Sequence, residues 1–288
     1  MRCDLHVHTV HSGMCTIPLL RYVCRESYNP AGAVYERLKQ LGMDLVTITD
    51  HDSIDAAEEL RRRPDFFLSE EVTVTLPSGT ELHVGVYDIT DGDHVELQRR
   101  RNDFESLLAY LLHRRLFFSA NHSFSSLTGR RTVEDFECIA RHFPALETRN
   151  SLMLRAANRN AAQFAAWFDK AEIGGSDAHA MASVGRAWTL VRGARDKREY
   201  LEGLRGGCGR PRGQSGSAWK LTRDLLAIGG NMLRESPATL PLAPLVLLLP
   251  FVTLTNYFRE AAFARRWFGR LASSTLQVPA IGSAEVAA

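Results

Sequence analysis

The sequence predicts an α/β protein whose strands and helices alternate around a parallel sheet or barrel, with an apolar helical appendage at its carboxyl-terminal end. From Met1 to about Arg205, short apolar runs bounded by turn residues alternate with stretches that carry apolar residues every three or four positions. Beyond Arg205 the chain becomes rich in glycine, serine and arginine, and then continues as a long uncharged segment. A length of 288 residues accommodates one large α/β domain with such an appendage.

The order of elements along the first 207 residues is a repeated strand and helix. Strands are expected at residues 2–7, 44–49, 67–76, 82–88, 115–120, 145–149, 171–175 and 186–192. Helices are expected at residues 30–41, 54–62, 94–113, 133–142, 155–169 and 196–204. The turn residues between 76 and 82 separate two alternating runs, so strands 67–76 and 82–88 are expected to form an antiparallel hairpin.

The composition is that of a globular protein. Hydrophobic residues make up 45% of the chain and charged residues 24%, which excludes collagen, disulfide-rich miniproteins and disordered tails. The formal net charge of +2 gives no whole-chain reason to expect nucleic acid or an anionic membrane as partner. The five cysteines are scattered and form no Cys-x-x-Cys pair, which favours a reducing compartment. Because Arg2 and Asp4 stand where a signal peptide needs apolar residues, we expect a cytoplasmic location.

The carboxyl-terminal part has three predicted regions. Residues 208–217 are expected to be a linker that ends a domain of residues 1–207, residues 218–272 to be helical, and residues 273–288 to be a disordered tail. The segment 236–258 holds 23 residues without a formal charge, which is long enough to cross a bilayer, although four prolines oppose a straight helix.

Three roles are open for this segment. A single crossing from the cytoplasm would place Arg259 and the arginines after it outside, against the usual bias of basic residues toward the cytoplasmic side. An interfacial or re-entrant membrane contact through 236–258, at the inner face of the membrane, avoids that conflict. The alternatives are a true span and a buried helix or oligomer contact.

Histidines and acidic residues gather at the ends of predicted strands, which is where a barrel keeps its active site. In Asp4-Leu5-His6-Val7-His8, alternation along a strand turns His6 and His8 to one face. A lone His-x-His also occurs by chance as two ordinary polar residues on a half-exposed strand. The apolar run 46–49 ends in Asp50-His51-Asp52, where Asp52 could cap a helix and His51 could face the same site.

A hairpin of two strands and two further strand ends follow the same pattern. Glu71 lies on the polar face of its strand, and His83 lies on the corresponding face of the returning strand. The next ends come at Asn121-His122 and at Gly174-Gly175-Ser176-Asp177-Ala178-His179. Each signal is weak alone, but five strand ends with ligand-type residues in one domain predict a metal site.

These motifs, together with Glu147-Thr148-Arg149-Asn150, resemble those of the polymerase and histidinol phosphatase (PHP) superfamily of metal-dependent phosphoesterases, in family order over about residues 1–207. The resemblance implies a distorted seven-stranded β/α (TIM-like) barrel that holds two or three divalent ions, zinc, manganese or iron, at the carboxyl ends of its strands.

The resemblance also implies a ligand for each ion. His6 and His8 resemble ligands of a first ion that is shared with Asp177 and bridged by Glu71 to a second. His83 and His122 resemble ligands of that second ion, and His51 and His179 those of a third. Where many members carry an acidic or histidine ligand shortly after the His-x-His, this chain reads His11-Ser12-Gly13-Met14-Cys15. His11 or Cys15 could substitute there, or the third ion could be weak or absent.

The predicted chemistry is hydrolysis of a phosphoester by a metal-bridging hydroxide, with His179 or Asp50 as proton donor to the leaving group. Arg130, Arg131, Arg149 and Arg186 are candidates for holding the phosphate, and their alternative is a role as surface arginines. The expected substrate is a small phosphorylated metabolite or nucleotide. The alternatives are a nuclease or phosphotyrosine phosphatase on a macromolecular substrate, a metal hydrolase that acts on another bond, and a weakly catalytic metal-binding module that anchors a partner.

Overall fold

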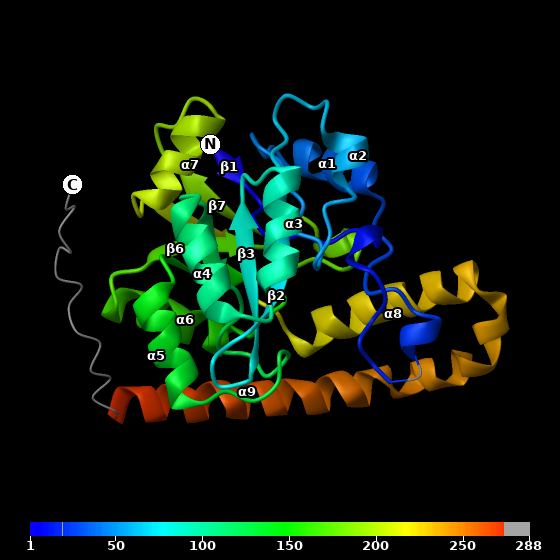
Figure 1. Ribbon diagram of the computed structural model, residues 1–288. Coiled ribbons are helices and arrows are strands. Elements are labelled where there is room, and N and C mark those ends of the chain that lie inside the picture. The colour runs from blue at the N-terminus through cyan, green and yellow to red at the C-terminus, as the bar shows by residue number, and fades with distance from the viewer. Residues whose placement is uncertain (19, 274–288) are drawn as a thin grey trace, which may run out of the picture.

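The computed structural model describes residues 1–18 and 20–273, which form an α/β body with a long helical hairpin along one side (Figure 1). Its central sheet has five strands in the order β2-β3-β4-β5-β6. These are β2 (Ser69–Thr75), β3 (Glu81–Tyr87), β4 (Phe117–Ala120), β5 (Ala145–Asn150) and β6 (Ala171–Gly175). The first three pair antiparallel and the last three parallel, so the predicted hairpin is confirmed, with Thr73 opposite His83.

A second, antiparallel sheet joins the two ends of the α/β region. It contains β1 (Arg2–Cys3), β7 (Ala187–Val191) and β8 (Gly209–Gly213) in the order β1-β7-β8. Strand β8 lies within residues 208–217, so the prediction of a linker there is wrong for those five residues. Pro211 is tolerated opposite Thr189 because β8 is an edge strand, where a missing N–H breaks no ladder.

The predicted seven-stranded barrel is not confirmed, because the described residues contain no closed sheet. The predicted strands 2–7 and 44–49 are mostly extended chain joined by isolated bridges, such as Val7 with Ala178 and His51 with Glu71. Side chains occupy the amides that a ladder would use: Val7 N donates to Thr49 Oγ1 at 3.0 Å, and Thr9 N donates to Asp50 Oδ1 at 2.6 Å. These segments therefore belong to the functional site more than to a sheet.

The helices of the α/β body follow the predicted ranges closely. They are α1 (Ala31–Gln40), α2 (Ala57–Leu60), α3 (Asp91–Arg100), α4 (Phe104–His113), α5 (Val133–His142), α6 (Arg155–Trp167) and α7 (Lys197–Arg205), with 3-10 turns η1 (Val10–Ser12), η2 (Leu20–Tyr22) and η3 (Met181–Ser183). The single helix predicted over 94–113 is two helices. Asp103 takes an extended conformation and its side chain accepts from Ser106 N, which starts α4 as a separate helix.

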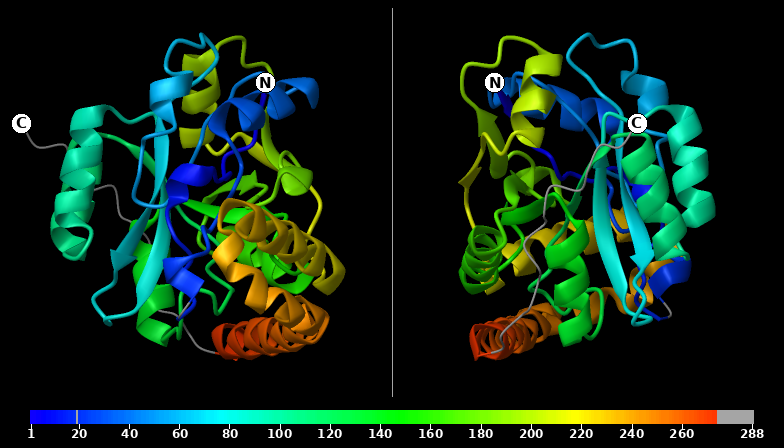
Figure 2. Two further views of the ribbon diagram at one scale, coloured as in Figure 1. Left: turned by 90° about the vertical axis from the view of Figure 1, so that its right-hand side faces the viewer. Right: turned by 60° about the vertical axis from the view of Figure 1, so that its left-hand side comes forward.

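The hairpin consists of α8 (Ala218–Glu235), η4 (Pro237–Leu248) and α9 (Leu249–Ser273). Helices α8 and α9 run side by side (Figure 2), and their connected end projects beyond the α/β body (Figure 1). Pro241 and Pro244 lie inside η4, where a regular α-helix would lose hydrogen bonds. Of the predicted disordered tail 273–288, Ser273 is the last residue of α9 and the rest lies outside the described residues.

The inner face of α9 completes the main hydrophobic core. Trp267 is 3% exposed and its ring centroid lies 5.1 Å from that of Phe136, which in turn contacts Phe124 and Phe164. This core also contains the apolar faces of β2, β3 and α4. The hairpin is therefore packed into the α/β body.

We predict that Trp267→Ala lowers the free energy of unfolding by about 3–5 kcal/mol, the usual cost of removing a large aromatic side chain from a core. Trp219→Ala is the matched control, because Trp219 on α8 is 75% exposed and should change stability by less than about 0.5 kcal/mol. Denaturant unfolding of the full chain measures both. Equal losses in the two variants would contradict the packing of α9 into the core.

Candidate metal centre

All eight predicted metal ligands lie in one cluster at the end of the central sheet. They are His6, His8, His51, Glu71, His83, His122, Asp177 and His179. Glu71 and His83 lie on β2 and β3, while His122, Asp177 and His179 follow β4 and β6. The remaining three come from the two extended segments that carry isolated bridges.

The carboxylate of Glu71 is the centre of this cluster. Its Oε2 atom lies 3.2 Å from His6 Nε2, 3.3 Å from His51 Nδ1, 3.5 Å from His8 Nε2 and 3.6 Å from His83 Nδ1. Its Oε1 atom lies 3.4 Å from His122 Nε2. Burial alone would raise the pKa of Glu71, but the surrounding imidazoles, His6 first, outweigh it and hold that pKa well below its usual range. The group is therefore a carboxylate that faces imidazoles on both oxygens.

His6, His8 and Asp177 form a tight group beside Glu71. The two Nε2 atoms of the histidines lie 3.0 Å apart, and Asp177 Oδ1 lies 3.5 Å from the first and 3.3 Å from the second. Burial lowers the pKa of His8 to about 3, so this imidazole is neutral at physiological pH. Two imidazole nitrogens and a carboxylate oxygen directed at one point are a ligand set for a divalent ion.

His51 and His179 flank a carboxylate that the motif analysis missed, that of Glu26. Its Oε1 atom lies 3.5 Å from Nε2 of each histidine. Glu26 N donates to Gly13 O at 3.0 Å, which places this residue beside the position where many members of the resembled family carry an acidic or histidine ligand and this chain does not. His11 and Cys15, the substitutes considered from the sequence, have no described contact with the eight ligands. Glu26 is therefore the stronger candidate for the place that the sequence left open, because it contacts both His51 and His179.

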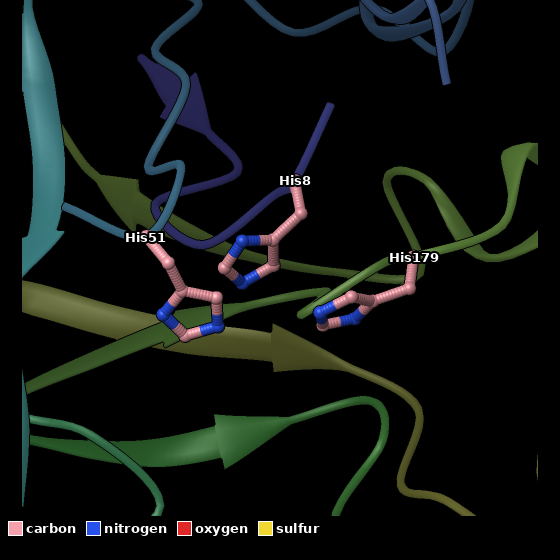
Figure 3. A group of neighbouring side chains, drawn as sticks. All are labelled: His8, His51 and His179. Carbon is pink, nitrogen blue, oxygen red and sulfur yellow. The ribbon is translucent and has the colours of Figure 1, made fainter. Parts of the chain in front are cut away.

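Figure 3 shows His8, His51 and His179 directed toward one another from three separate segments. The ring centroid of His8 lies 4.6 Å from that of His51 and 4.2 Å from that of His179, and both pairs are stacked. His51, His83 and His179 keep 13%, 20% and 16% of their side chains exposed, whereas His6, His8 and Glu71 are almost fully buried. The cluster is therefore open to solvent on the side of these three histidines and Glu26.

Hydrogen bonds from neighbouring residues fix the orientation of the ligands. Glu147 Oε1 lies 2.8 Å from His6 Nδ1, and its Oε2 accepts from His122 N at 3.1 Å. Asn150 Nδ2 donates to both Glu147 and Asp177, at 2.8 Å and 2.9 Å. A carboxylate on the far nitrogen of a histidine sets its tautomer and makes it a better ligand.

Asp50 supports His8 through Ser12. Asp50 accepts hydrogen bonds from Thr9 N, Thr9 Oγ1 and Ser12 Oγ at 2.6 to 2.7 Å, and Ser12 Oγ lies 3.0 Å from His8 Nδ1. Both oxygens of Asp50 are thus engaged within the loop that follows the His-x-His. This arrangement favours His179 over Asp50 as the proton donor, a role that stays a prediction.

The backbone is strained at two of the ligands. His122 has φ 28° and Asp177 has φ 51°, in the left-handed region that side chains other than glycine rarely adopt. Such conformations persist where the surrounding structure enforces them, and they cluster at functional sites. At both residues the turn aims the side chain back at Glu71 and His6.

The donor set fits divalent metal ions. Glu71 Oε2, His83 Nδ1, His122 Nδ1 and His179 Nε2 are buried without a hydrogen-bond partner among the described residues, which is costly unless a further group binds there. Four groups of three ligand atoms lie within 4.8 Å of one another: His6, His8 and Asp177; His6, Glu71 and His122; His51, Glu71 and His83; and His8, His51 and His179. Imidazole and carboxylate donors suit zinc, manganese and iron.

The ligand groups differ in detail from the predicted assignment. His83 groups with His51 and Glu71, while His122 groups with His6 and Glu71. The sequence assigned His83 and His122 to one ion and His51 to another. Glu71 is common to both groups, which agrees with its predicted bridging position.

The four arginines proposed to hold phosphate are dispersed. Arg131 is 5% exposed and donates to Glu81 O at 2.5 Å and to Thr128 Oγ1, and burial lowers its pKa to about 10, so it serves to anchor its loop. Arg149 donates to Ser215 Oγ, Arg186 donates to Ala182 O, and Arg130 is exposed. None of the four has a described contact with the eight ligands. The contacts of Arg131 argue against a role in binding substrate. For Arg130, Arg149 and Arg186 that role stays a prediction.

Comparisons with known proteins agree with this fold. The family model described as PHP-associated matches residues 155–207, which include Asp177 and His179. The match agrees with the resemblance to that family that the sequence motifs show. No curated protein sequence matches the chain.

Two solved structures are similar in fold to this chain. PsfC from Pseudomonas syringae PB-5123 has a TM-score of 0.56 and 18% identity, and the match covers 82% of this chain and 98% of that one. A two-domain protein from Bacteroides vulgatus ATCC 8482 that contains a predicted PHP-like metal-dependent phosphoesterase also has a TM-score of 0.56, at 13% identity, covering 79% of this chain and 69% of that one. At these identities the likeness concerns the fold.

We predict that Glu26→Gln weakens one metal site of this cluster. An amide is a much poorer ligand than a carboxylate and removes the negative charge between His51 and His179, so the variant should lose about one bound ion or bind it at least tenfold more weakly. Metal analysis after dialysis measures this. Glu36→Gln, on the exposed face of α1, is the control. Unchanged metal content in Glu26→Gln would exclude Glu26 as a ligand.

Proposed function

We propose that this PHP domain hydrolyses phosphoesters in a metal-dependent reaction, with a small phosphorylated metabolite or nucleotide as substrate. The observation that carries the proposal is Glu71, a fully buried carboxylate whose two oxygens face different imidazole groups within one cluster. A cluster that can hold adjacent divalent ions would, when loaded, lower the pKa of a water and offset charge on phosphate oxygens. Zinc, manganese and iron each suit the donor set.

The residues of the chain have separate tasks in this proposal. His6, His8 and Asp177 would hold one ion and Glu71 would bridge to a second, in the company of His83 and His122. His51 and Glu26 would hold a third, beside His179, which in this proposal carries a proton in place of a metal ion. Glu147 and Ser12 keep the ring nitrogens of His6 and His8 aimed at the centre throughout.

His179 is the residue we propose to deliver a proton to the leaving oxygen. It lies on the exposed side of the cluster, and its Nε2 atom has no hydrogen-bond partner among the described residues. Burial lowers its pKa, while Glu26 and Asp177 outweigh burial and raise that pKa above its usual value. A histidine held ready to carry a proton at this side can serve as a general acid.

The small exposed area of the cluster supports a small substrate. Among the described residues, partial exposure at the cluster is confined to His51, His83, His179 and Glu26. A nuclease or phosphotyrosine phosphatase needs a wider opening above the metal ions, because its substrate is a polymer. The panel of substrates described below distinguishes these alternatives.

We predict that the purified protein releases phosphate from phosphomonoesters or phosphodiesters, that chelation abolishes the activity, and that added divalent metal restores it. His8→Ala and Asp177→Asn should each lower kcat/KM by at least about 100-fold, because loss of a ligand costs more than loss of a residue that merely orients one. His113→Gln, at the end of α4 and outside the cluster, should keep full activity.

The panel should include small phosphate esters, single-stranded and double-stranded nucleic acid, and a phosphotyrosine peptide, with metal content measured on the same samples. Turnover only on the polymers would favour the alternative functions. Bound metal without turnover on any substrate would exclude phosphoester hydrolysis and leave a binding role.

A further inference from the structure

The outer side of the helical hairpin exposes a continuous set of large apolar residues, which we call the outer apolar surface. Its members are Leu240, Leu245, Leu247, Leu248, Phe251, Val252, Leu254, Tyr257 and Phe258. They account for nine of the nineteen large hydrophobic residues that are exposed among the described residues, within less than a tenth of the chain. Helical residues 237–273 are apolar and long enough to cross a membrane, and only 11% of their most apolar stretch is buried. Exposed apolar clusters of this kind mark contact surfaces.

The opposite side of α9 packs against α8 and, in its second half, against the α/β body. Thr253 Oγ1 lies 2.6 Å from Thr222 Oγ1 of α8, and Asn160 of α6 donates to Ala264 O at 2.8 Å. Glu260 accepts from Ser125 Oγ at 2.8 Å, in the loop that carries His122. Because the second half of α9 is held against the body on one side, the lipid contact that suits this arrangement is parallel to the helix.

The same outer side turns from apolar to cationic along α9. Phe251, Phe258 and Arg265 are seven residues apart and share one stripe of the helix, and Val252, Arg259 and Arg266 share the next. The four arginines of α9, Arg259, Arg265, Arg266 and Arg270, are exposed and make no ion pair with the described residues. The single acidic residue of 236–273, Glu260, is 7% exposed and faces inward.

We propose that the outer apolar surface and the four arginines of α9 bind the surface of a bilayer that contains anionic lipids. The apolar side chains would enter the boundary between headgroups and acyl chains, and the arginines would lie at the level of the phosphates. The apolar residues match the acyl chains of such a bilayer, and the arginines, which have no exposed carboxylate among them, match its negative charge. The binding is independent of catalysis and would place the metal centre beside the membrane.

Charge argues against a second copy of the chain as the occupant. In a symmetric dimer the same surface meets itself, and the outer side of residues 236–273 carries no carboxylate to meet the arginines. Anionic lipid supplies that complement without any further protein.

Flotation of the full chain with vesicles tests the proposal, with phosphatidylcholine vesicles compared with vesicles that also contain phosphatidylglycerol. Wild type should float with the anionic vesicles and much less with the neutral ones, and added salt should weaken the binding. Phe251→Ser and Phe258→Ser should each lower partition by about tenfold or more. Arg265→Gln with Arg266→Gln should lower it by roughly 10- to 30-fold on anionic vesicles only.

Matched controls separate binding from folding and from catalysis. Leu112→Ser on α4 and Arg205→Gln on α7 remove an exposed apolar side chain and an exposed cation elsewhere, and both should float as wild type does. Metal content and thermal midpoint should be unchanged in every variant, which would distinguish lost binding from a damaged metal centre. Absence of wild-type flotation, or equal binding in the surface variants, would overturn the proposal, as would a stable dimer that Phe251→Ser dissociates without any vesicle binding.

Discussion

The buried carboxylate of Glu71 is the group on which the metal centre and its surroundings depend. Removing a carboxylate from water is costly unless positive or hydrogen-bonding groups replace the water, and here imidazoles surround one oxygen while Asn121 Nδ2 donates to the other at 2.8 Å. The backbone of Glu71 also bonds to Asp50 O and Asp52 N, which ties the segment of His51 to the central sheet. One residue, Glu71, therefore supplies the central negative charge of the cluster and also fixes the position of the segment that carries His51.

Most of the site could be predicted from sequence because its ligands are local to strands. Alternation along a strand places His6 with His8, and Glu71 on the face opposite its apolar neighbours, and strand ends gather at one edge. Glu26 could not be found this way, since its position depends on the loop after Gly13 folding back through a backbone hydrogen bond. The pattern of spacing carries no signal for such a contact.

The helices and strands of the fold could also be predicted from the sequence, but the way in which the strands join into sheets could not. Helix and hairpin periodicities identified the elements, whereas closure of the sheet depends on which donor each amide finds. The side chains of Thr49 and Asp50 accept hydrogen bonds from backbone amides that the ladder of a barrel would use. Conversely, Pro211 lies in a β-strand within a segment whose glycine-rich composition predicts a linker. Likewise, a formal net charge of +2 conceals the separation of charge along α9, where four exposed arginines face outward and Glu260 faces inward.

Three loops beside the metal centre are braced by the hairpin that follows them in the chain. Glu260 holds Ser125 in the loop of His122, Lys220 Nζ donates to Ser151 O at 2.6 Å beside Asn150, and Asp224 accepts from Ser183 after His179. During synthesis, a growing chain that has already exposed Asp177 and His179 still lacks these braces. Two of these braces come from α8 and the third from α9, so the loops around the metal centre have their full set of contacts only once both helices have been synthesised.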